Sequence, residues 1–400
     1  MPWKAKGLEN MRREFVERAL SKEKSKTELC REYGISRPTG DKWIARYQAG
    51  DPLTDQSRAP QHHDNRTPQA LEAEIVAYRK QYPAIGAVKL HRMLENEGRT
   101  GLPSAKTFNN IFRRNGLITK EASLAATPCK RFEKSRPNEM WQADYKGHFK
   151  LSDRTECHPL NITDDHSRYS ICCRPMYGET FAEIKPVMEE LFYTYGLPFS
   201  FLCDNGNPWG TAQSTGYSRC EVWLMELGVL TLHGRARHPQ TQGKDESFNR
   251  SFTREFLKYC TPEDMTDAAY RFEEYRAFYN EKRPHHALGL EVPSSVYRRS
   301  AREMPDKIKR WDYDDGCQVR KVKSTGFFTY DGQGYFLSEA FAGKEIAIRK
   351  SRLPGQITLL FRQFRIGRID IEKRVFTTRR AYLLQGDPRG NANAAAFAAP

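Results

Sequence analysis

The sequence lacks long apolar runs and paired cysteine motifs. No apolar stretch approaches the about 18–20 residues that a membrane span needs. The nine cysteines are odd in number and never form CxxC, which favours reduced thiols over a disulfide framework or a zinc finger. The first fifteen residues are charged and helical in pattern, unlike a signal peptide. These absences predict a cytoplasmic protein with no membrane partner.

The chain instead has an excess of basic residues. Its 65 Lys and Arg outnumber its 50 Asp and Glu, which gives a net charge of +15. An excess of this kind is typical of proteins that bind a polyanion. The 400 residues also exceed the roughly 250–300 that a single core usually holds. We therefore expect several domains, some of which bind nucleic acid.

Residues 1–50 have the pattern of a helix-turn-helix DNA-binding domain. Apolar spacing predicts helices over 8–20, 25–34 and 38–47, with a short glycine-containing turn before the third. In such a motif the last helix lies in the major groove, and its first residues face the base edges. The candidate DNA contacts are Ser36, Arg37, Thr39, Lys42 and Arg46.

A polar, proline-containing linker over 51–67 separates this unit from a second helical domain over 68–118. Helices are predicted there at 68–82, 87–97 and 104–115. The domain is either a second helix-turn-helix unit or a packing module, and its basic residues favour DNA contact: Lys89, Arg92, Lys106, Arg113 and Arg114. Residues 119–138 form a basic linker.

Residues 139–300 alternate strand and helix patterns. Strands are predicted at 141–149, 160–163, 169–176, 199–203 and 229–232, and helices at 181–195, 222–227, 243 onward and 262–279. Pro186 should kink the helix over 181–195 or mark a later start. This order predicts an α/β domain with a mixed sheet.

Three carboxylates stand out in this domain. Asp144 and Asp204 end short apolar runs, and Glu246 opens a helical pattern. Together they would form an oxygen-rich pocket suited to Mg²⁺. Two such ions can stabilise both oxygens of an in-line phosphoryl displacement. Because the chain is basic, we expect the phosphate to belong to nucleic acid.

Residues 311–381 carry only strand patterns, at 319–322, 327–330, 334–337, 345–349, 358–361 and 365–371. Short strands at this spacing predict a small all-β barrel. Arg365 and Arg368 alternate with aromatic residues, which favours DNA binding. The alanine-rich end, 382–400, is predicted to be a disordered tail.

Six motifs occur in order within the α/β domain. They are W-x-x-D-Y at 141–145, T-D-D-x-S-R-Y at 163–169, Y-G-L-P at 195–198, D-N-G at 204–206, H-P-Q-T-Q-G-K-x-E-x-F-N-R at 238–250 and Y-N-x-x-R-P-H at 279–285. With them, residues 139–300 resemble the retroviral-integrase-type catalytic core of bacterial insertion-sequence transposases, the DDE enzymes of the RNase H-like fold. The flanking units also resemble that family's layout.

The resemblance implies an active site and its substrates. Asp144, Asp204 and Glu246 would be the catalytic residues and the metal ligands, holding two Mg²⁺ ions for which Mn²⁺ can substitute. Lys244 and Arg250 would hold phosphates of the DNA end, and Asn249 would orient a base or phosphate. The helical units would recognise terminal inverted repeats, and target DNA would be the second substrate. A homo-oligomer, at least a dimer, is expected in the bacterial cytoplasm at the nucleoid.

The chain departs from the family in one interval. Forty-one residues separate Asp204 from Glu246, where about 35 are usual in such transposases, and we expect the excess in the loop over 207–221. Asp164 and Asp165 are interpreted as turn residues rather than ligands. Two alternative functions remain open: a metal-dependent nuclease of the same fold without strand transfer, and a domesticated DNA-binding regulator.

Overall fold

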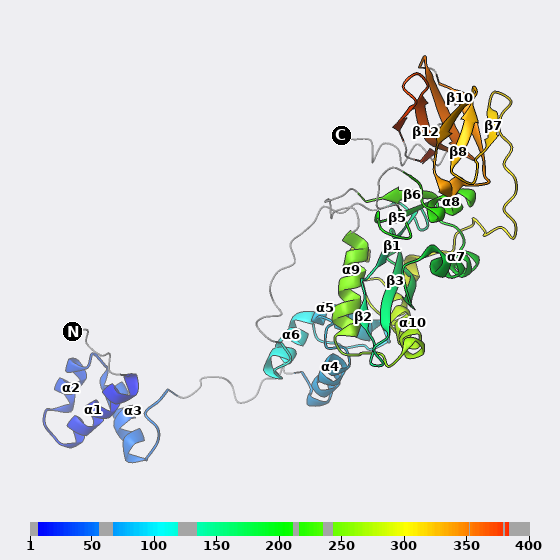
Figure 1. The fold of residues 1–400 in the computed structure, drawn as a ribbon. Coiled ribbons are helices and arrows are strands. Elements are labelled where there is room, and N and C mark those ends of the chain that lie inside the picture. Colours follow the sequence, from blue (N-terminus) through cyan, green and yellow to red (C-terminus); the bar gives the residue numbers. More distant parts are fainter. Residues whose placement is uncertain are drawn as a thin grey trace. The chain divides into compact units, whose positions relative to one another are not determined.

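The computed structural model describes residues 7–55, 67–118, 134–210, 216–234, 243–351, 353–378 and 381–383, apart from the side chains of 243–245 and 377–378. The chain divides into two compact units, residues 1–67 and residues 68–400 (Figure 1). None of the described helices is long and apolar enough to cross a membrane.

The first unit is a bundle of three helices: α1 (Leu8–Leu20), α2 (Lys26–Glu32) and α3 (Arg37–Gln48). Its core contains Phe15, Leu29 and Trp43. Ser25 and Ser36 begin α2 and α3, and each side-chain oxygen accepts a hydrogen bond from a backbone N–H three residues later, which satisfies a free donor of the first turn. The predicted helix-turn-helix arrangement is therefore present.

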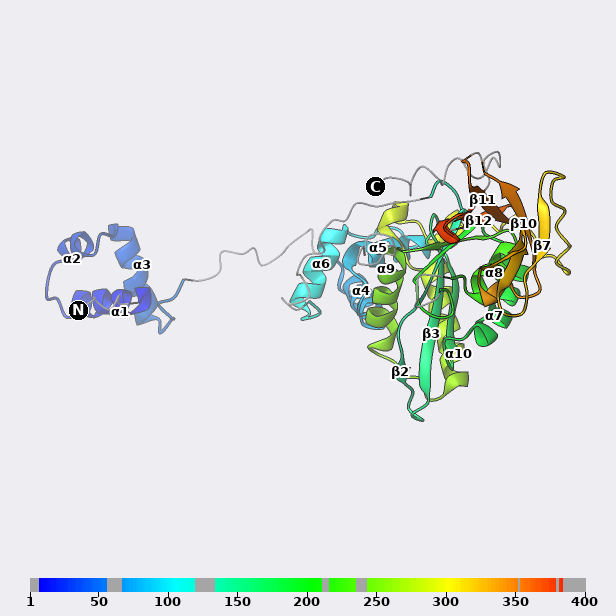
Figure 2. The same ribbon diagram turned by 45° about the horizontal axis from the view of Figure 1, so that its top comes forward.

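A second helical bundle opens the other unit: α4 (Gln69–Gln81), α5 (Ala87–Asn96) and α6 (Ala105–Arg114). It packs against the α/β domain and lies beside α9 (Figure 2). Tyr82 stacks on Phe278 with ring centroids 5.2 Å apart, and Arg92 forms an ion pair with Glu291 at 2.8 Å. These contacts explain why the second bundle belongs to the same compact unit as the α/β domain.

The α/β domain contains a mixed sheet whose strands are β1 (Met140–Tyr145), β2 (Phe149–Lys150), β3 (Glu156–Asp164), β4 (Ser170–Met176), β5 (Ser200–Cys203) and β6 (Leu230–His233). The order is β2-β3-β1-β5-β6, and β4 also pairs with β3. β1 runs antiparallel to β3 and parallel to β5, and β5 is parallel to β6. The single strand predicted over 141–149 is wrong, because Gly147 adopts φ +85° and separates β1 from β2.

Helices cover both faces of this sheet. α7 (Phe181–Tyr195) and α8 (Arg219–Glu226) share one core with Cys172, whereas α9 (Gly243–Phe252), its π-helical continuation η3 (Thr253–Leu257) and α10 (Met265–Glu281) share another with Cys173. Neighbouring residues of a strand face opposite sides, so these two cysteines identify the two faces. α7 begins at Phe181 with Thr180 as its cap, so the late start allowed for Pro186 is wrong.

The C-terminal region is an antiparallel sheet. Its strands are β7 (Gln318–Lys321), β10 (Glu345–Lys350), β11 (Gln356–Phe361), β12 (Phe364–Asp370), β13 (Val375–Thr378) and β14 (Tyr382–Leu383), and β8 (Phe327–Tyr330) with β9 (Gln333–Phe336) forms a separate hairpin. The order is β13-β12-β11-β10-β7. No pairing of β13 with β7 closes a barrel within the described strands, so the closed barrel stays a prediction.

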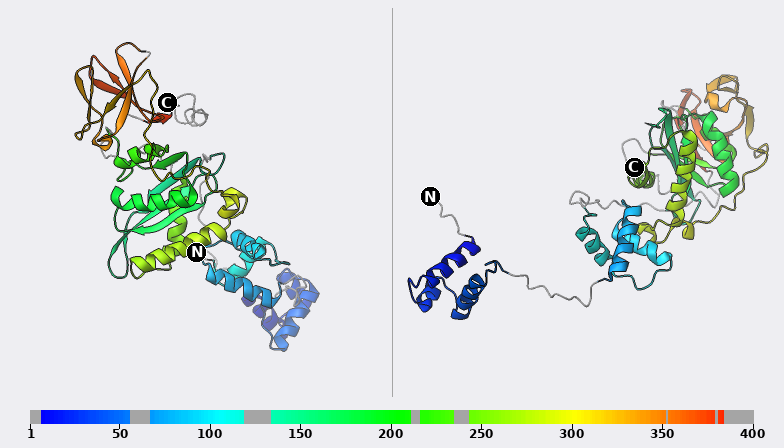
Figure 3. Two further views of the ribbon diagram at one scale, coloured as in Figure 1. Left: turned by 90° about the vertical axis from the view of Figure 1, so that its right-hand side faces the viewer. Right: turned by 90° about the horizontal axis from the view of Figure 1, so that it is seen from below.

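The C-terminal sheet packs on the end of the core that carries α8 and β6 (Figure 3). Tyr217 donates a hydrogen bond from its hydroxyl to the Ile366 carbonyl at 2.5 Å, and its carbonyl accepts one from Ser338 at 3.0 Å. Tyr217 lies in the long interval between Asp204 and Glu246. Part of that interval therefore attaches the C-terminal sheet. The short segments η4 (His286–Leu288), α11 (Pro293–Val296) and η5 (Glu339–Phe341) complete the fold.

Candidate active site

Asp144 projects from β1 toward α9. Trp141 and Ala143 of the same strand pack in the core on the α7 side, so alternation turns Asp144 to the opposite face. There the Asn249 amide donates to Asp144 Oδ2 at 2.9 Å, and Asn161 donates to Asn249 Oδ1 at 2.6 Å. This chain of amides fixes the orientation of the carboxylate.

Asp204 follows β5, the parallel neighbour of β1, so both carboxylates lie at the same edge of the sheet. The Gly206 N–H donates to Asp204 Oδ1 at 2.9 Å. A Cβ at Gly206 would lie 3.1 Å from Asp204 Oδ2, which explains the glycine in D-N-G. His233 Nδ1 lies 2.8 Å from the Asp204 carbonyl, and its Nε2 lies 2.9 Å from Glu221 Oε1. The imidazole thus connects Asp204 to α8.

Glu246 is exposed in the first half of α9, and the three carboxylates act on one another electrostatically. Burial first, and then the negative charges of Asp204 and Glu246, raise the pKa of Asp144 to about 6, while the hydrogen bonds from Tyr145 and Asn249 act in the opposite direction. Among the described residues, no basic side chain contributes to the pKa of Asp144.

The chemistry of these donors fits a hard divalent cation. Carboxylate oxygens are the preferred ligands of Mg²⁺, and a bound cation would lower the raised pKa of Asp144. Within the part of the chain that the structure describes, no group of three His, Cys, Asp or Glu side chains is already close enough to hold an ion. The carboxylates are thus neighbours rather than a closed cage.

Comparisons with known families cover most of the chain in separate pieces. Residues 134–239 and 227–293 match two profiles of the integrase core domain, and residues 11–61 match a helix-turn-helix domain. Residues 317–377 match the C-terminal domain of the IS481 family of transposases. Region by region, the chain is therefore similar to integrase-core transposases of insertion sequences, and its C-terminal region is similar to that of the IS481 family.

Several proteins of other insertion sequences are similar over parts of their length. The putative transposase of IS5376 from Geobacillus stearothermophilus is 26% identical over 196 residues, which cover 48% of each chain. The matched chain thus spans about half the length of that relative. An uncharacterized protein of IS407 from Burkholderia multivorans is 24% identical over 281 residues, covering 68% of this chain and 89% of its own.

Solved structures of viral integrases are also similar. The HTLV-2 integrase catalytic core domain in complex with magnesium covers 41% of this chain and 99% of its own, with 14% identity and a TM-score of 0.32. A simian T-cell lymphotropic virus intasome in complex with PP2A regulatory subunit B56 gamma covers 72% of this chain and 91% of its own, with 14% identity and a TM-score of 0.36.

The predicted DNA contacts in the helix-turn-helix unit have different surroundings. Arg37 and Lys42 are exposed on α3. Ser36 caps the helix, and its hydroxyl lies 2.8 Å from that of Thr39. Arg46 donates to the Thr54 carbonyl at 3.1 Å. DNA contact by all five residues stays a prediction.

The other predicted contacts are dispersed over the core and the C-terminal sheet. Arg250 is exposed on α9. Asn249 is 8% exposed, and its amide is hydrogen-bonded to Asp144 and Asn161. Arg365 stacks over the Tyr382 ring at 4.8 Å, and Arg368 is half-buried on β12. The side chain of Lys244 lies outside the described residues. DNA contact by these residues also stays a prediction.

Sequence reasoning missed the residues that support the carboxylates. Asn161, Glu221 and His233 lie outside the W-x-x-D-Y, D-N-G and H-P-Q-T-Q-G motifs, although an Asn and a His near strand ends in an apolar context were available signals. Conversely, Asp164 and Asp165 are buried and accept backbone N–H groups of Asn138, Ser167 and Lys134. Their interpretation as residues that order a turn agrees with these bonds.

The Y-N-x-x-R-P-H motif also has a structural role. Asn280 is buried and bonds both the N–H and the carbonyl of Ser170, which joins α10 to β4. Arg283 is 6% exposed and pairs with Glu255 at 2.6 Å. His285 is buried beside it, and burial with the Arg283 charge lowers its pKa to about 2, so the imidazole is neutral.

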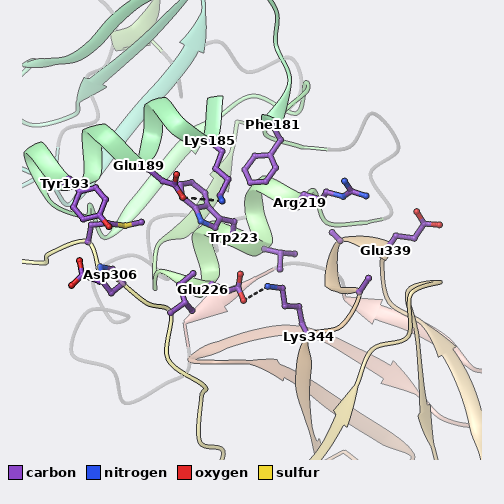
Figure 4. A pocket seen from close by; sticks show the side chains of 16 residues that line it. Phe181, Lys185, Glu189, Tyr193, Arg219, Trp223, Glu226, Asp306, Glu339 and Lys344 are labelled. Atoms are coloured by element: carbon purple, nitrogen blue, oxygen red, sulfur yellow. Dashed lines mark hydrogen bonds and ion pairs between the residues drawn. The ribbon is translucent and has the colours of Figure 1, made fainter. Parts of the chain in front are cut away.

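A cavity of about 650 Å³ lies between α7, α8 and the C-terminal region (Figure 4). Trp223 and Lys185 line it, and the ion pair between Lys344 and Glu226 at 2.7 Å bridges the core to the C-terminal sheet there. None of the three predicted catalytic carboxylates lines this cavity. It therefore belongs to the junction of the two regions rather than to the active site.

Proposed function

We propose that this chain is a DNA transposase that binds terminal inverted repeats, frees 3′-hydroxyl ends and joins them to target DNA by metal-dependent transesterification. The observation that carries the proposal is electrostatic: the charges of Asp204 and Glu246 help to raise the pKa of Asp144. The matches to the integrase core domain and to the C-terminal domain of IS481-family transposases support the same activity.

The two steps are in-line displacements at phosphorus. Water attacks the phosphodiester at the element's end, and the 3′-oxygen leaves and takes up a proton. The freed 3′-hydroxyl then attacks a target phosphodiester and loses its proton, while a target 3′-oxygen leaves. Two Mg²⁺ ions, or Mn²⁺ in their place, would supply Lewis acidity and activate the attacking oxygen. No covalent intermediate with the protein is needed.

The chain's own residues would bind and orient the reacting groups. Asp144, Asp204 and Glu246 would hold the cations. Asn249 keeps the Asp144 carboxylate turned toward α9, and His233 holds the backbone at Asp204. Supporting bonds of this kind orient first ligands and tune their affinity. Asn249 is thereby assigned to the carboxylate in addition to the base or phosphate contact predicted for it.

The remaining regions would bind DNA. The helix-turn-helix unit would read the terminal repeats through α3, and the second helical bundle and the C-terminal sheet would hold the DNA backbone. Synapsis of two ends requires a homo-oligomer, at least a dimer, working at the nucleoid in the bacterial cytoplasm.

Strand transfer with Mg²⁺ tests this proposal. A labelled duplex that carries the ends flanking the gene is mixed with a plasmid target, and the wild type is compared with Glu246→Gln. Joined product from the wild type alone is expected. Cleavage without joining would favour the nuclease, and tight binding of the ends with neither reaction would favour the regulator.

A further inference from the structure

A second cavity lies where the second helical bundle meets the catalytic core. Its volume is about 510 Å³, and it is lined by the start of α5 on one side and by α9 and η3 on the other. The two sides are held together by the stacking of Tyr82 on Phe278 and by the Arg92–Glu291 ion pair. The cavity is thus built into a packed interface within one compact unit.

The lining is strongly cationic. Lys89, Arg250, Arg254 and Arg283 contribute four positive charges, and Glu255 is the one acidic residue in the lining. Arg283 uses its guanidinium on Glu255, with both distances 2.6 Å, and on Ser251. The Glu255 charge is therefore already compensated by Arg283, and three cations remain.

Within the described parts of the chain, no hydrogen bond or ion pair joins Lys89, Arg250 or Arg254 to an acceptor. Lys89 is half-buried, and burial together with the charges of Arg283 and Arg254 lowers its pKa to about 8, against the opposing effect of Glu255. An ammonium group held near two guanidinium groups without an acceptor favours an anion between them.

Backbone features add to this arrangement. Helix α5 starts at Ala87 with no side-chain cap, so its first N–H groups and the positive end of its dipole face the cavity that Gly86 and Ala87 line. On the other side, Arg254 and Glu255 belong to the π-helical segment η3. π-Helical turns are rare and frequent at functional sites.

We propose that this cavity binds a phosphate of the DNA backbone, with Lys89, Arg250 and Arg254 as its cationic contacts. The identity of the DNA as the element's end rests on the proposed function. Arg250 and Arg254 lie four and eight residues after Glu246, or roughly 6 and 12 Å along the helix axis. A strand that rises about 3.4 Å per nucleotide would place the bound phosphate two to four nucleotides from the reacting one.

The site has a structural consequence for recognition. Because the second helical bundle contributes Lys89 and the catalytic helix contributes Arg254, a phosphate between them fixes the DNA relative to both. The cavity thereby sets the distance between the bound DNA phosphate and the three carboxylates.

DNA binding by the full-length protein tests the cavity separately from catalysis. Fluorescence anisotropy with the end duplex is measured without divalent metal over a series of salt concentrations, for the wild type, Lys89→Gln, Arg254→Gln and the matched surface control Lys150→Gln. Each cavity variant should weaken binding by about 3–10-fold and lower the salt slope by about one, while the control binds like the wild type. Melting temperatures verify that each variant is folded.

A neutral methylphosphonate at single positions of the duplex sharpens the test. One position two to four nucleotides from the reacting phosphate should weaken binding of the wild type and leave that of Lys89→Gln unchanged. Equal binding by the wild type and both cavity variants, or no such position, would overturn the proposal even if strand transfer occurs.

A third experiment distinguishes DNA phosphate from free phosphate as the ligand of the cavity. It is decisive if the wild type does not bind the end duplex. Melting temperature is compared in inorganic phosphate and in chloride at equal ionic strength. A rise with phosphate that Lys89→Gln lacks would show a site for free phosphate and overturn DNA backbone as its ligand. No rise together with no DNA binding would show that the cavity holds no phosphate.

Discussion

Two groups of carboxylates lie on or beside the same sheet and differ in what surrounds them. Asp164 and Asp165 are 1% and 0% exposed, and Asp164 alone accepts three hydrogen bonds, from Asn138 and twice from Ser167. Asp144 receives one side-chain hydrogen bond, from Asn249, and adjoins two more carboxylates. The protein supplies hydrogen-bond donors to the first pair. The second group has few such donors and is suited to a bound cation.

The difference teaches how to separate structural from functional acids. A buried carboxylate that only supports the fold is given donors, because each missing hydrogen bond is costly. A carboxylate that binds a cation must keep its oxygens available. The sequence places both groups in family motifs and favours a turn role for Asp164 and Asp165, and the hydrogen-bond partners supply the physical reason for that difference.

The largest expected effects come from substitutions in the two groups. Substitution of a predicted metal ligand should abolish strand transfer, and substitution of a buried turn carboxylate should lower stability. Glu246→Gln should reduce strand transfer by at least on the order of 10³-fold because it removes one ligand charge from the cations. Its melting temperature should stay near that of the wild type, since Glu246 is exposed.

Asp164→Ala should show the reverse pattern. Three buried donors lose their acceptor, which should lower the free energy of unfolding by about 2–4 kcal/mol. Chemical denaturation of the purified protein measures it. If Asp164→Ala is as stable as the wild type, or if Glu246→Gln unfolds first, the division of roles is wrong.

The next effect concerns the stability of the metal-free protein and its dependence on pH. The pKa of Asp144 is raised from 3.8 to about 6 by burial and then by Asp204. The folded state therefore binds this proton more tightly than the unfolded state, and the stability that the proton confers is lost as the pH rises from about 4 through about 6.

Asp144→Asn removes that loss. Without metal, the variant should be more stable than the wild type at pH 7.5, by on the order of 1–3 kcal/mol, and the difference should vanish near pH 4. Melting curves at the two pH values, with EDTA present, measure this. A variant less stable than the wild type at pH 7.5 would show that the charge of Asp144 is already compensated.

A smaller effect is expected from Asn249, which donates a hydrogen bond to one of the carboxylates. Asn249→Ala removes the donor that orients Asp144 and should lower metal affinity by about 10–100-fold. The Mg²⁺ concentration needed for half-maximal strand transfer should rise, while saturating Mg²⁺ restores much of the rate. If saturating Mg²⁺ restores nothing, Asn249 contacts the DNA as the sequence predicts and does more than position Asp144.

Local sequence patterns predicted much of the fold. The helices at 8–20 and 181–195 have the predicted bounds, because apolar periodicity is a local signal and Thr180 caps the second helix. The strand predicted over 141–149 failed at Gly147, whose positive φ the alternating pattern does not reveal. Closure of the C-terminal sheet depends on pairing between distant strands, which local patterns do not determine.

The sequence likewise predicts only part of the candidate site. Asp144, Asp204 and Glu246 could be chosen from the sequence because each lies in its own motif. The bond from Asn249 to Asp144, and the cavity between Lys89 and Arg254, could not. They depend on which face of α9 meets β1 and α5, and residues far apart in the chain supply the two sides.

Direct binding of Mn²⁺ tests the central claim that the three neighbouring carboxylates form the cation site. Electron paramagnetic resonance counts free and bound Mn²⁺ at pH 7.5 for the wild type, Asp204→Asn and Asp165→Asn. If the claim is right, the wild type and Asp165→Asn bind Mn²⁺, and added Mg²⁺ displaces it. Asp204→Asn should bind little Mn²⁺. Equal binding by all three proteins would contradict it.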